Sequence, residues 1–263
     1  MLKRLLVLPL LALESLGVSE HASIGIGGLY SNSSATNVNV QYYGIHLNLH
    51  TDLISQNHKI KFSAEFDWNR GSGGRKLSNS QLAYLEKFGS GKNFRYSHIL
   101  IRFGFNLASK ETPLFLNLIG GFGKVTNSHK ETDLLKRTTW KAGIELEGAF
   151  PLGQNSKFTY SAGYLPTSIY YSFIDPSRGD KGMSARSYVS KLGHTVLVSV
   201  GFTQAINERL YFYTKLKGQY KVFGESKLVP ININIIDTAT AITNTNYPAS
   251  RDVGAMLEVG IGF

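Results

Sequence analysis

The side chains of this chain best suited to acid–base chemistry are Glu65, Asp67 and His98. Glu65 and Asp67 are separated by one residue, so both carboxylates lie on the same face of an extended segment. His98 falls on the next extended segment, where its imidazole can face them, and Asp252 is a fourth candidate for the same rim. Carboxylate–histidine contacts support proton transfer at some sites, although they are more common as ordinary buried pairs.

Extended segments must position these residues, because apolar side chains recur at every second position along much of the chain. In the stretch KIKFSAEFDW, for example, Ile60, Phe62, Phe66 and Trp68 share one face, and the other face is polar or charged. Most such stretches are as long as the about 9–11 residues of a tilted membrane strand, or longer. Ten are predicted, at about 20–30, 38–50, 59–68, 94–106, 113–125, 137–150, 158–172, 191–203, 210–223 and 251–263.

The connections between these segments alternate in length. The short ones are 51–58, 107–112, 151–157 and 204–209, and the longer ones are 31–37, 69–93, 126–136, 173–190 and 224–250. Short turns at one end and long loops at the other are typical of an up-and-down transmembrane β-barrel. We therefore predict an all-β fold with one ten-stranded antiparallel barrel domain over 20–263. Eight or twelve strands, or a soluble sandwich or lipocalin-like barrel with its apolar face inside, are the alternatives.

The N-terminal residues predict a signal peptide over 1–19. Lys3 and Arg4 precede the apolar run 5–13, and the small residues Gly17 and Ser19 are candidate cleavage points. A buried N-terminal helix is the alternative. With export, the barrel is expected in the outer membrane, with long loops outside the cell. The chain contains no cysteine, so disulfides are excluded.

Aromatic residues on the apolar face gather near the two ends of the segments. Trp68 and Trp140 lie near the long-loop ends, whereas Phe150, Phe202 and Phe212 lie near the short-turn ends. Two aromatic belts are expected where a barrel crosses the two membrane interfaces.

The last residues alternate in the same way, with Leu257, Val259, Ile261 and the terminal Phe263 on one face. This ending resembles the C-terminal signal of bacterial outer-membrane β-barrel proteins. The resemblance implies that the barrel-assembly machinery and periplasmic chaperones are partners during biogenesis, and that the last strand pairs with the first. It identifies no subfamily.

The opposite face of the segments is charged and is expected to line the lumen. If Leu210 lies opposite Phe263, Lys215 falls beside Glu258 and Lys221 beside Asp252. Charges in so narrow a barrel must pair or stay hydrated, so we predict a polar, salt-bridged plug. The expected inward charges are Lys59, Lys61, Glu65, Asp67, Arg102, Lys141, Glu145, Glu147, Lys215, Lys217, Lys221, Asp252 and Glu258.

Ten strands also make the chain similar to the omptin proteases, whose site pairs an acid dyad with an Asp–His dyad at the outer rim. Glu65 and Asp67 match the first dyad, but His194 falls on the lipid-facing side and has no acid two residues before it. Lipid A deacylases are a second comparison, for which only His21 and Ser23 have the spacing, at the periplasmic start. A rim hydrolase is therefore the second alternative function.

The formal net charge is +10, and the loop 69–93 is strongly basic. Outside an outer membrane the nearest polyanion is lipopolysaccharide, which makes it the expected partner rather than nucleic acid. Candidate surface-binding residues are Arg70, Arg75, Lys76, Lys87 and Lys92. The sequence favours a structural or adhesin-like role, with a host or other surface ligand bound through loops 69–93, 173–190 and 224–250. The first alternative is a narrow channel. No cofactor or metal site is expected.

Overall fold

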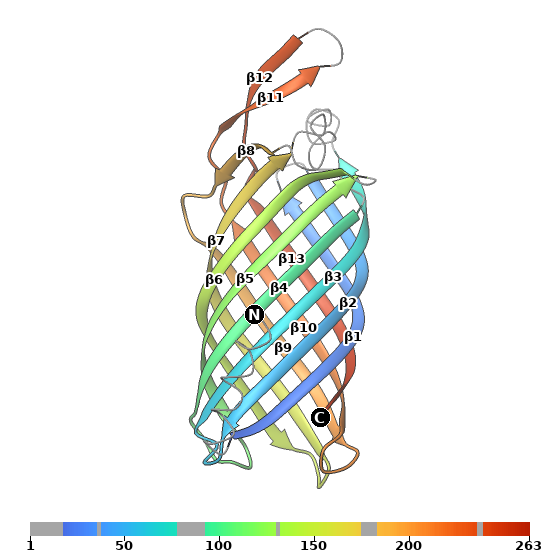
Figure 1. The fold of residues 1–263 in the computed structure, drawn as a ribbon, viewed down its shortest axis with the longest axis vertical. Coiled ribbons are helices and arrows are strands. Elements are labelled where there is room, and N and C mark those ends of the chain that lie inside the picture. Colours follow the sequence, from blue (N-terminus) through green and yellow to red (C-terminus); the bar gives the residue numbers. More distant parts are fainter. Residues whose placement is uncertain (1–17, 36–37, 78–92, 130–131, 175–182, 236–238) are drawn as a thin grey trace, which may run out of the picture.

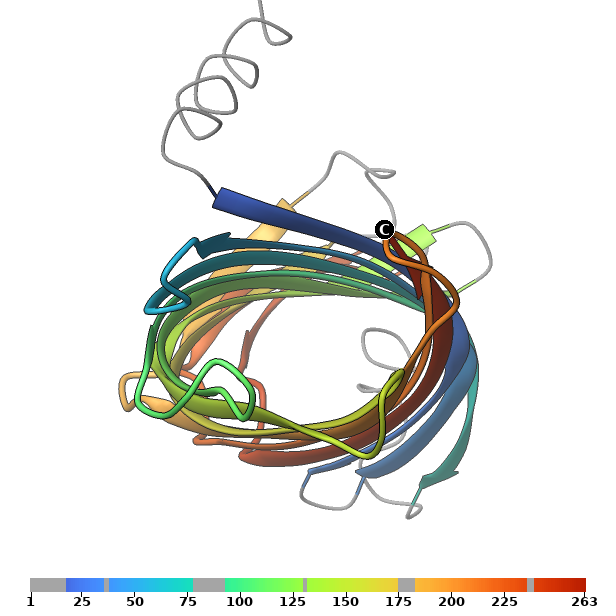
Figure 2. The ribbon, with the colours of Figure 1, turned by 90° about the horizontal axis from the view of Figure 1, so that it is seen from below.

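The computed structural model describes residues 18–35, 38–77, 93–129, 132–174, 183–235 and 239–263. Its strands form a tall antiparallel barrel that closes on itself (Figures 1 and 2). The ring follows the order β1-β2-β3-β4-β5-β6-β7-β9-β10-β13, and β13 pairs with β1. The sheet has eleven strands, of which β8 pairs only with β7, so ten form the closed ring. The predicted strand number is confirmed.

Seven of the ten ring strands, β1 to β7, are longer than predicted. The ring strands are β1 (Val18–Ala35), β2 (Val38–Ser55), β3 (Ile60–Leu77), β4 (Asn93–Asn106), β5 (Leu114–His129), β6 (Thr132–Pro151), β7 (Ser156–Ile174), β9 (Gly193–Ala205), β10 (Tyr211–Phe223) and β13 (Ser250–Gly262). Outside the ring lie β8 (Met183–Tyr188), β11 (Val229–Ile235) and β12 (Ala239–Thr245). In the described residues no helix has the length and apolar character needed to cross a membrane.

The register fixes the shape of the barrel. Starting at Lys61 and moving one strand at a time around the ring leads back to Gly73 on the same strand, a shift of twelve residues. With ten strands about 4.8 Å apart, that shift requires a strand tilt of about 40° and a backbone radius of about 10 Å. Side chains can fill most of a lumen this narrow.

The two faces of the strands are divided as predicted. Apolar side chains such as Phe66, Trp140 and Leu257 point outward and are exposed, whereas Lys61, Glu65 and Glu258 point inward and are buried. Because a soluble barrel would bury its apolar face, this arrangement requires lipid around the wall. At the closing seam, the backbone N–H and C=O of Phe263 both pair with Ala22 at 2.8 Å.

Several predicted loops are wrong in their extent. Loop 31–37 shrinks to the two residues between β1 and β2, and Arg70, Arg75 and Lys76 lie on β3 rather than in a loop. Above the apolar belt the strands continue with polar residues on the outer face as well, so the two-residue contrast that marks a membrane strand disappears. The expected hairpin in 224–250 is present as β11–β12, which projects beyond the barrel (Figure 1). Lys87 and Lys92 lie outside the described residues.

Candidate functional site

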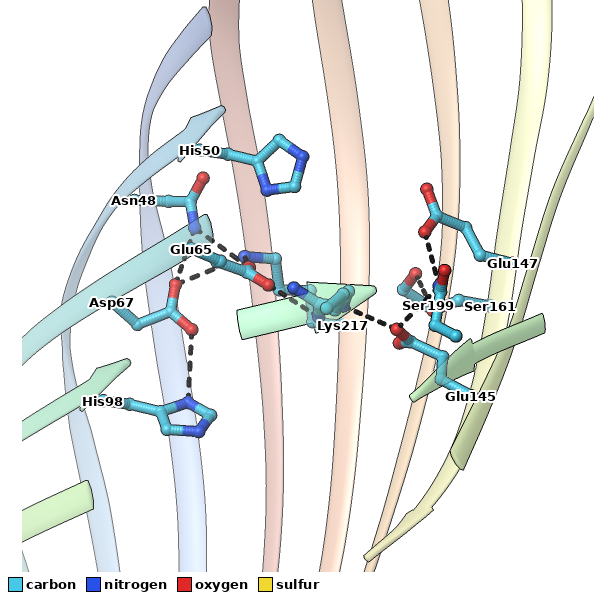
Figure 3. Close-up of polar contacts among 12 residues, drawn as sticks. Asn48, His50, Glu65, Asp67, His98, Glu145, Glu147, Ser161, Ser199 and Lys217 are labelled. Carbon is cyan, nitrogen blue, oxygen red and sulfur yellow. Dashed lines mark hydrogen bonds and ion pairs between the residues drawn. The ribbon is translucent and has the colours of Figure 1, made fainter. Parts of the chain in front are cut away.

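The centre of the lumen is organised around the ammonium group of Lys217 on β10. Its Nζ lies 2.6 Å from Oε1 of Glu65, 3.0 Å from Oε2 of Glu258 and 3.3 Å from Oδ1 of Asp67. These carboxylates come from β3 and β13, so one lysine joins three strands. All four residues are buried. Figure 3 shows Glu65 and Asp67 on one wall, with Lys217 between them and the opposite wall.

Further side chains complete the coordination of these acids. Asn48 on β2 donates its amide N–H groups to Glu65 at 3.0 Å and to Asp67 at 2.8 Å. His46, which is fully buried, contacts Asn69 through Nδ1 at 2.8 Å and Glu258 through Nε2 at 3.1 Å. The hydroxyl of Tyr213 donates to the other oxygen of Glu258. Each buried carboxylate is therefore both paired and hydrogen-bonded, as burial of charge requires.

A second group of ion pairs crosses the lumen nearer the short turns. Arg102 on β4 bridges Glu65 at 2.8 Å and Glu145 on β6 at 2.5 Å. Lys61 pairs with Glu147, which also accepts a hydrogen bond from Asn117 at 3.0 Å. These contacts join β3, β4, β5 and β6 across the interior.

The predicted pairing in the last hairpin is correct in register and wrong in ion-pair partners. Lys215 is opposite Glu258 and Lys221 is opposite Asp252, as expected. Glu258, however, binds Lys217, two residues further along β10, because diagonal neighbours come within reach of a long side chain. Asp252 instead binds Arg137 on β6 at 3.2 Å and accepts a hydrogen bond from Ser33 on β1.

The acid–base candidates do not lie at a rim. Asp67 contacts His98 at 3.6 Å, but β3 continues from Asp67 for ten more residues to Leu77. At about 3.3 Å per residue and a tilt of about 40°, the pair lies about 25 Å below the strand end. Glu65 is deeper still, whereas Asp252 is near the loop-side end of β13. The sequence predicts that this strand ends at Trp68, which would place Asp67 beside the strand end. His194 points outward, as predicted, and binds the Tyr164 hydroxyl.

Inward-facing charges balance within the described lumen. Among buried or half-buried side chains the acids are Asp52, Glu65, Asp67, Glu145, Glu147, Asp252 and Glu258, and the bases are Lys61, Arg102, Arg137, Lys141, Lys215, Lys217 and Lys221. The seven acids equal the seven bases in number, so the formal net charge of +10 must come from elsewhere in the chain. Sequence reasoning missed Arg137, His46 and the neutral partners. The alternation of the sequence places these side chains on the inward face, but the partner that each one contacts depends on the fold.

Free space in the lumen is divided. An open vestibule of about 730 Å³ at the short-turn end reaches Lys61, Phe115 and Glu147. Beyond Arg102 and Glu145 there is a cavity of only about 50 Å³, bordered by Asp67 and His98. That volume accommodates a few water molecules rather than a peptide or lipid. In the described residues, no group of three or more His, Asp or Glu side chains is arranged to hold a metal ion.

Apolar side chains gather in the loop-side part of the lumen. A buried cluster of Leu29, Val40, Tyr42, Phe94, Tyr96 and Met256 fills this region. A smaller cluster of Leu100, Ile119 and Leu165 lies against the wall. The charged network therefore has an aromatic and aliphatic cover on the side of the long loops.

The predicted aromatic belts face outward at two heights. Trp140 packs against Phe122 with ring centroids 4.8 Å apart, and Phe150 against Phe158 at 5.0 Å. Phe202 and Phe212 are exposed at the short-turn end. Trp68 lies eight residues along β3 from Ile60, the first residue of the strand. This separates the belts by about 20 Å along the barrel axis, close to the height of a lipid-facing band.

Comparison with known proteins places the fold. No protein-family model and no curated protein matches the sequence. The outer membrane protease OmpT from Escherichia coli is similar in structure, with a TM-score of 0.61 at 12% identity over 95% of this chain and 99% of OmpT. The translocator domain of the autotransporter NalP from Neisseria meningitidis gives 0.41 at 10% identity, covering 100% and 94%. Ail from Yersinia pestis gives 0.34 at 10% identity, covering 93% and 99%. The likeness to OmpT shows that the chain has an integral outer-membrane β-barrel fold.

Proposed function

We propose that this outer-membrane barrel is a closed scaffold that presents its loop end to ligands at the cell surface. The observation that carries this proposal is the blocked lumen. Buried ion pairs centred on Lys217 and Arg102 cross it, and the apolar cluster around Tyr42 and Met256 covers the loop side. A barrel filled in this way is suited to support and presentation rather than to passage of solutes.

The loop end supplies an ordered surface for such a role. Strand β8 extends the sheet beside β7, and the β11–β12 hairpin stands above it (Figure 1). A backbone hydrogen bond from Lys227 to Tyr188 at 3.0 Å joins the base of the β11–β12 hairpin to β8, and one from Ser226 to Tyr247 at 2.9 Å joins the two sides of that base. Tyr247 also stacks on Tyr171 of the barrel wall, with centroids 4.3 Å apart. These contacts favour a preorganised platform, which lowers the ordering cost of binding.

Planar-bilayer recording tests the closed lumen. We expect the refolded protein to insert without steady unitary openings, because ion pairs cross the lumen above the vestibule and the apolar cluster lies on the loop side. Insertion is verified separately by the heat-dependent shift in electrophoretic mobility. Steady openings whose size falls when Lys215 or Lys217 is neutralised would instead support the alternative of a narrow channel.

Lipopolysaccharide is the proposed lipid partner, and the outer wall offers a site for its phosphates. Arg70 on β3 is directly opposite Arg95 on β4, and both side chains are exposed. Lys124 on β5 is exposed at the same level, opposite Ser97 and Thr138. A phosphate group accepts charge-assisted hydrogen bonds from arginine and lysine side chains. The three cations lie just beyond Trp68 and Trp140, where headgroups are expected.

Removing two of these cations should weaken lipopolysaccharide binding. We expect R70Q/K124Q to lower the affinity for purified lipopolysaccharide in detergent about thirtyfold, because each of the two lost contacts to phosphate contributes of the order of 1 kcal/mol. The measurement is a titration followed by the unfolding temperature. The matched control is K157Q, which alters an exposed lysine at the opposite end of the barrel. Equal affinity for both variants and the wild type would contradict the site.

A further inference from the structure

Two exposed tyrosines lie side by side on the outer wall near the loop end. Tyr170 on β7 is directly opposite Tyr188 on β8, and their side chains are 45% and 44% exposed. The next residue of β7, Tyr171, and the preceding residue of β8, Ser187, are buried, so both tyrosines point away from the lumen. Opposite residues of an antiparallel pair lie close together on one face, so the two rings form one aromatic patch.

The strand register gives the height of this patch. A row of successive pairs climbs toward the loop end, because the circuit of pairs around the ring that leaves β3 at Lys61 returns to it at Gly73. The row through the patch is Trp68, Ser97, Lys124, Thr138, Tyr170 and Tyr188. With strands about 4.8 Å apart and tilted by about 40°, Tyr188 lies about 15 Å above Trp68. Embedding in lipid therefore does not explain the exposed rings, and an exposed aromatic patch of this kind marks an interaction site.

A lysine is attached to the patch. Nζ of Lys227 lies 4.5 Å from the centroid of the Tyr188 ring and donates to the Tyr188 hydroxyl at 2.5 Å. The exposed acid two residues before it, Glu225, accepts a hydrogen bond from Asn246. Lys227 is itself exposed, so its charge is available to a ligand that lies against the tyrosines.

More cations lie in the two rows that cross this part of the wall. Lys124 is in the row of the tyrosines, and the row above it runs through Arg70, Arg95, Thr126, Lys136, Ser172 and Arg186. Neither row contains an Asp or Glu residue. The wall from β3 to β8 therefore presents a basic band that begins at the proposed phosphate site and ends at the aromatic patch.

The position of the band indicates its ligand. It faces sideways, just above the headgroups, where the sugars of the surrounding lipopolysaccharide lie. A sugar ring has an apolar C–H face that can pack on an aromatic ring, and its hydroxyl and acidic groups can bind the tyrosine hydroxyls and the cations. Aromatic rings within a basic band match both properties of an acidic oligosaccharide.

We propose that Tyr170 and Tyr188 bind the core oligosaccharide of the lipopolysaccharide molecule whose phosphates contact Arg70 and Lys124. This inference rests on the proposed lipopolysaccharide site and extends it upward along the row through Lys124. The tyrosine rings pack against the sugar faces, and Lys227 contacts an acidic group of the core. One lipid molecule then follows the wall from the headgroup level to β8.

A comparison of complete lipopolysaccharide with lipid A alone, which lacks the core sugars, tests this site. We expect the wild-type barrel in detergent to bind the complete molecule at least tenfold more tightly, measured by titration followed by the unfolding temperature. Y170S/Y188S should remove this preference and leave the affinity for lipid A unchanged. The matched control is Y220S, which alters a tyrosine that is 41% exposed on β10, two strands beyond β7 in the ring, and should keep the preference.

The outcomes separate the sugar site from the phosphate site. If the wild type binds lipid A and complete lipopolysaccharide equally well, the sugar site is wrong and the phosphate site stands. If it binds neither ligand, both sites are wrong. A preference that persists in Y170S/Y188S also overturns the proposal, as does binding of a soluble sulfated polysaccharide through these tyrosines without any preference for the core.

Discussion

Replacing Lys217 with methionine is expected to destabilise the barrel by about 3–5 kcal/mol, which is typical when one partner of a buried ion pair is removed. Lys217 is the only lysine in the described network that contacts three carboxylates, those of Glu65, Asp67 and Glu258. Methionine has a similar volume, so packing changes little and the loss is electrostatic. The measurement is equilibrium unfolding in urea, with the barrel in detergent or lipid.

The neighbouring lysine provides the matched control. Lys215 faces inward two residues earlier on β10 and has no ion pair in the described part of the chain. K215M should change stability by less than about 1 kcal/mol, within the range of an unpaired, partly hydrated charge. Equal losses for K217M and K215M would show that the network does not depend on Lys217.

A double substitution identifies the cause of the loss. In K217M, Glu65 can be neutralised without leaving Arg102 unpaired, because Arg102 also binds Glu145 at 2.5 Å. Adding E65Q should recover part of the stability, because one of the three carboxylates that lose Lys217 disappears. A fully additive loss in the double variant would indicate that the two side chains do not interact.

The parts of this fold that sequence could predict follow from the two-residue period. The strand faces, the strand number and the register of the last hairpin depend on alternation and on Phe263 lying opposite the start of β10, and they are correct. The extent of the strands is not encoded in this way. Beyond the lipid, residues such as Asn32, Gln41 and Ser72 are outward and polar, so alternation no longer distinguishes strand from loop. The sequence therefore predicts too early an end for β3, and with it a position of Glu65 and Asp67 near the rim.

The partners of the charged side chains depend on three-dimensional distance rather than pattern. Sequence register puts Lys221 beside Asp252, but Arg137 reaches Asp252 across the lumen from β6, more than 100 residues away in the chain. Similarly, His46 meets Glu258 only because β1, which lies between their strands, carries glycine on its inner face. Such contacts require the closed ring, which brings the first and last strands together.

The second large expected effect concerns closure of the barrel, and it follows from the glycines of β1. Gly27 and Gly28 are adjacent on β1 and pair with Glu258 and Leu257 of β13. A Cβ atom added at Gly27 would lie 1.8 Å from the backbone oxygen of Leu257, whereas one added at Gly28 would meet no atom within 4 Å. G27A must therefore displace backbone at the seam, where β13 completes the ring. G28A only adds a methyl group on the lipid-facing side.

We expect G27A to lose about 1–3 kcal/mol of stability, the usual range for overpacking, and to assemble with a lower folded fraction. G28A should be unchanged or slightly more stable, because alanine reduces the entropy of the unfolded chain. Folded fraction is measured by heat-modifiable mobility after refolding into vesicles, and stability by urea titration. Both variants make the same glycine-to-alanine change on the same strand. They differ only in the face of the barrel wall that carries the added methyl group. If G27A and G28A refold alike, then the close approach of β1 to β13 does not limit closure, and the contact of His46 with Glu258 across that strand must tolerate a wider seam.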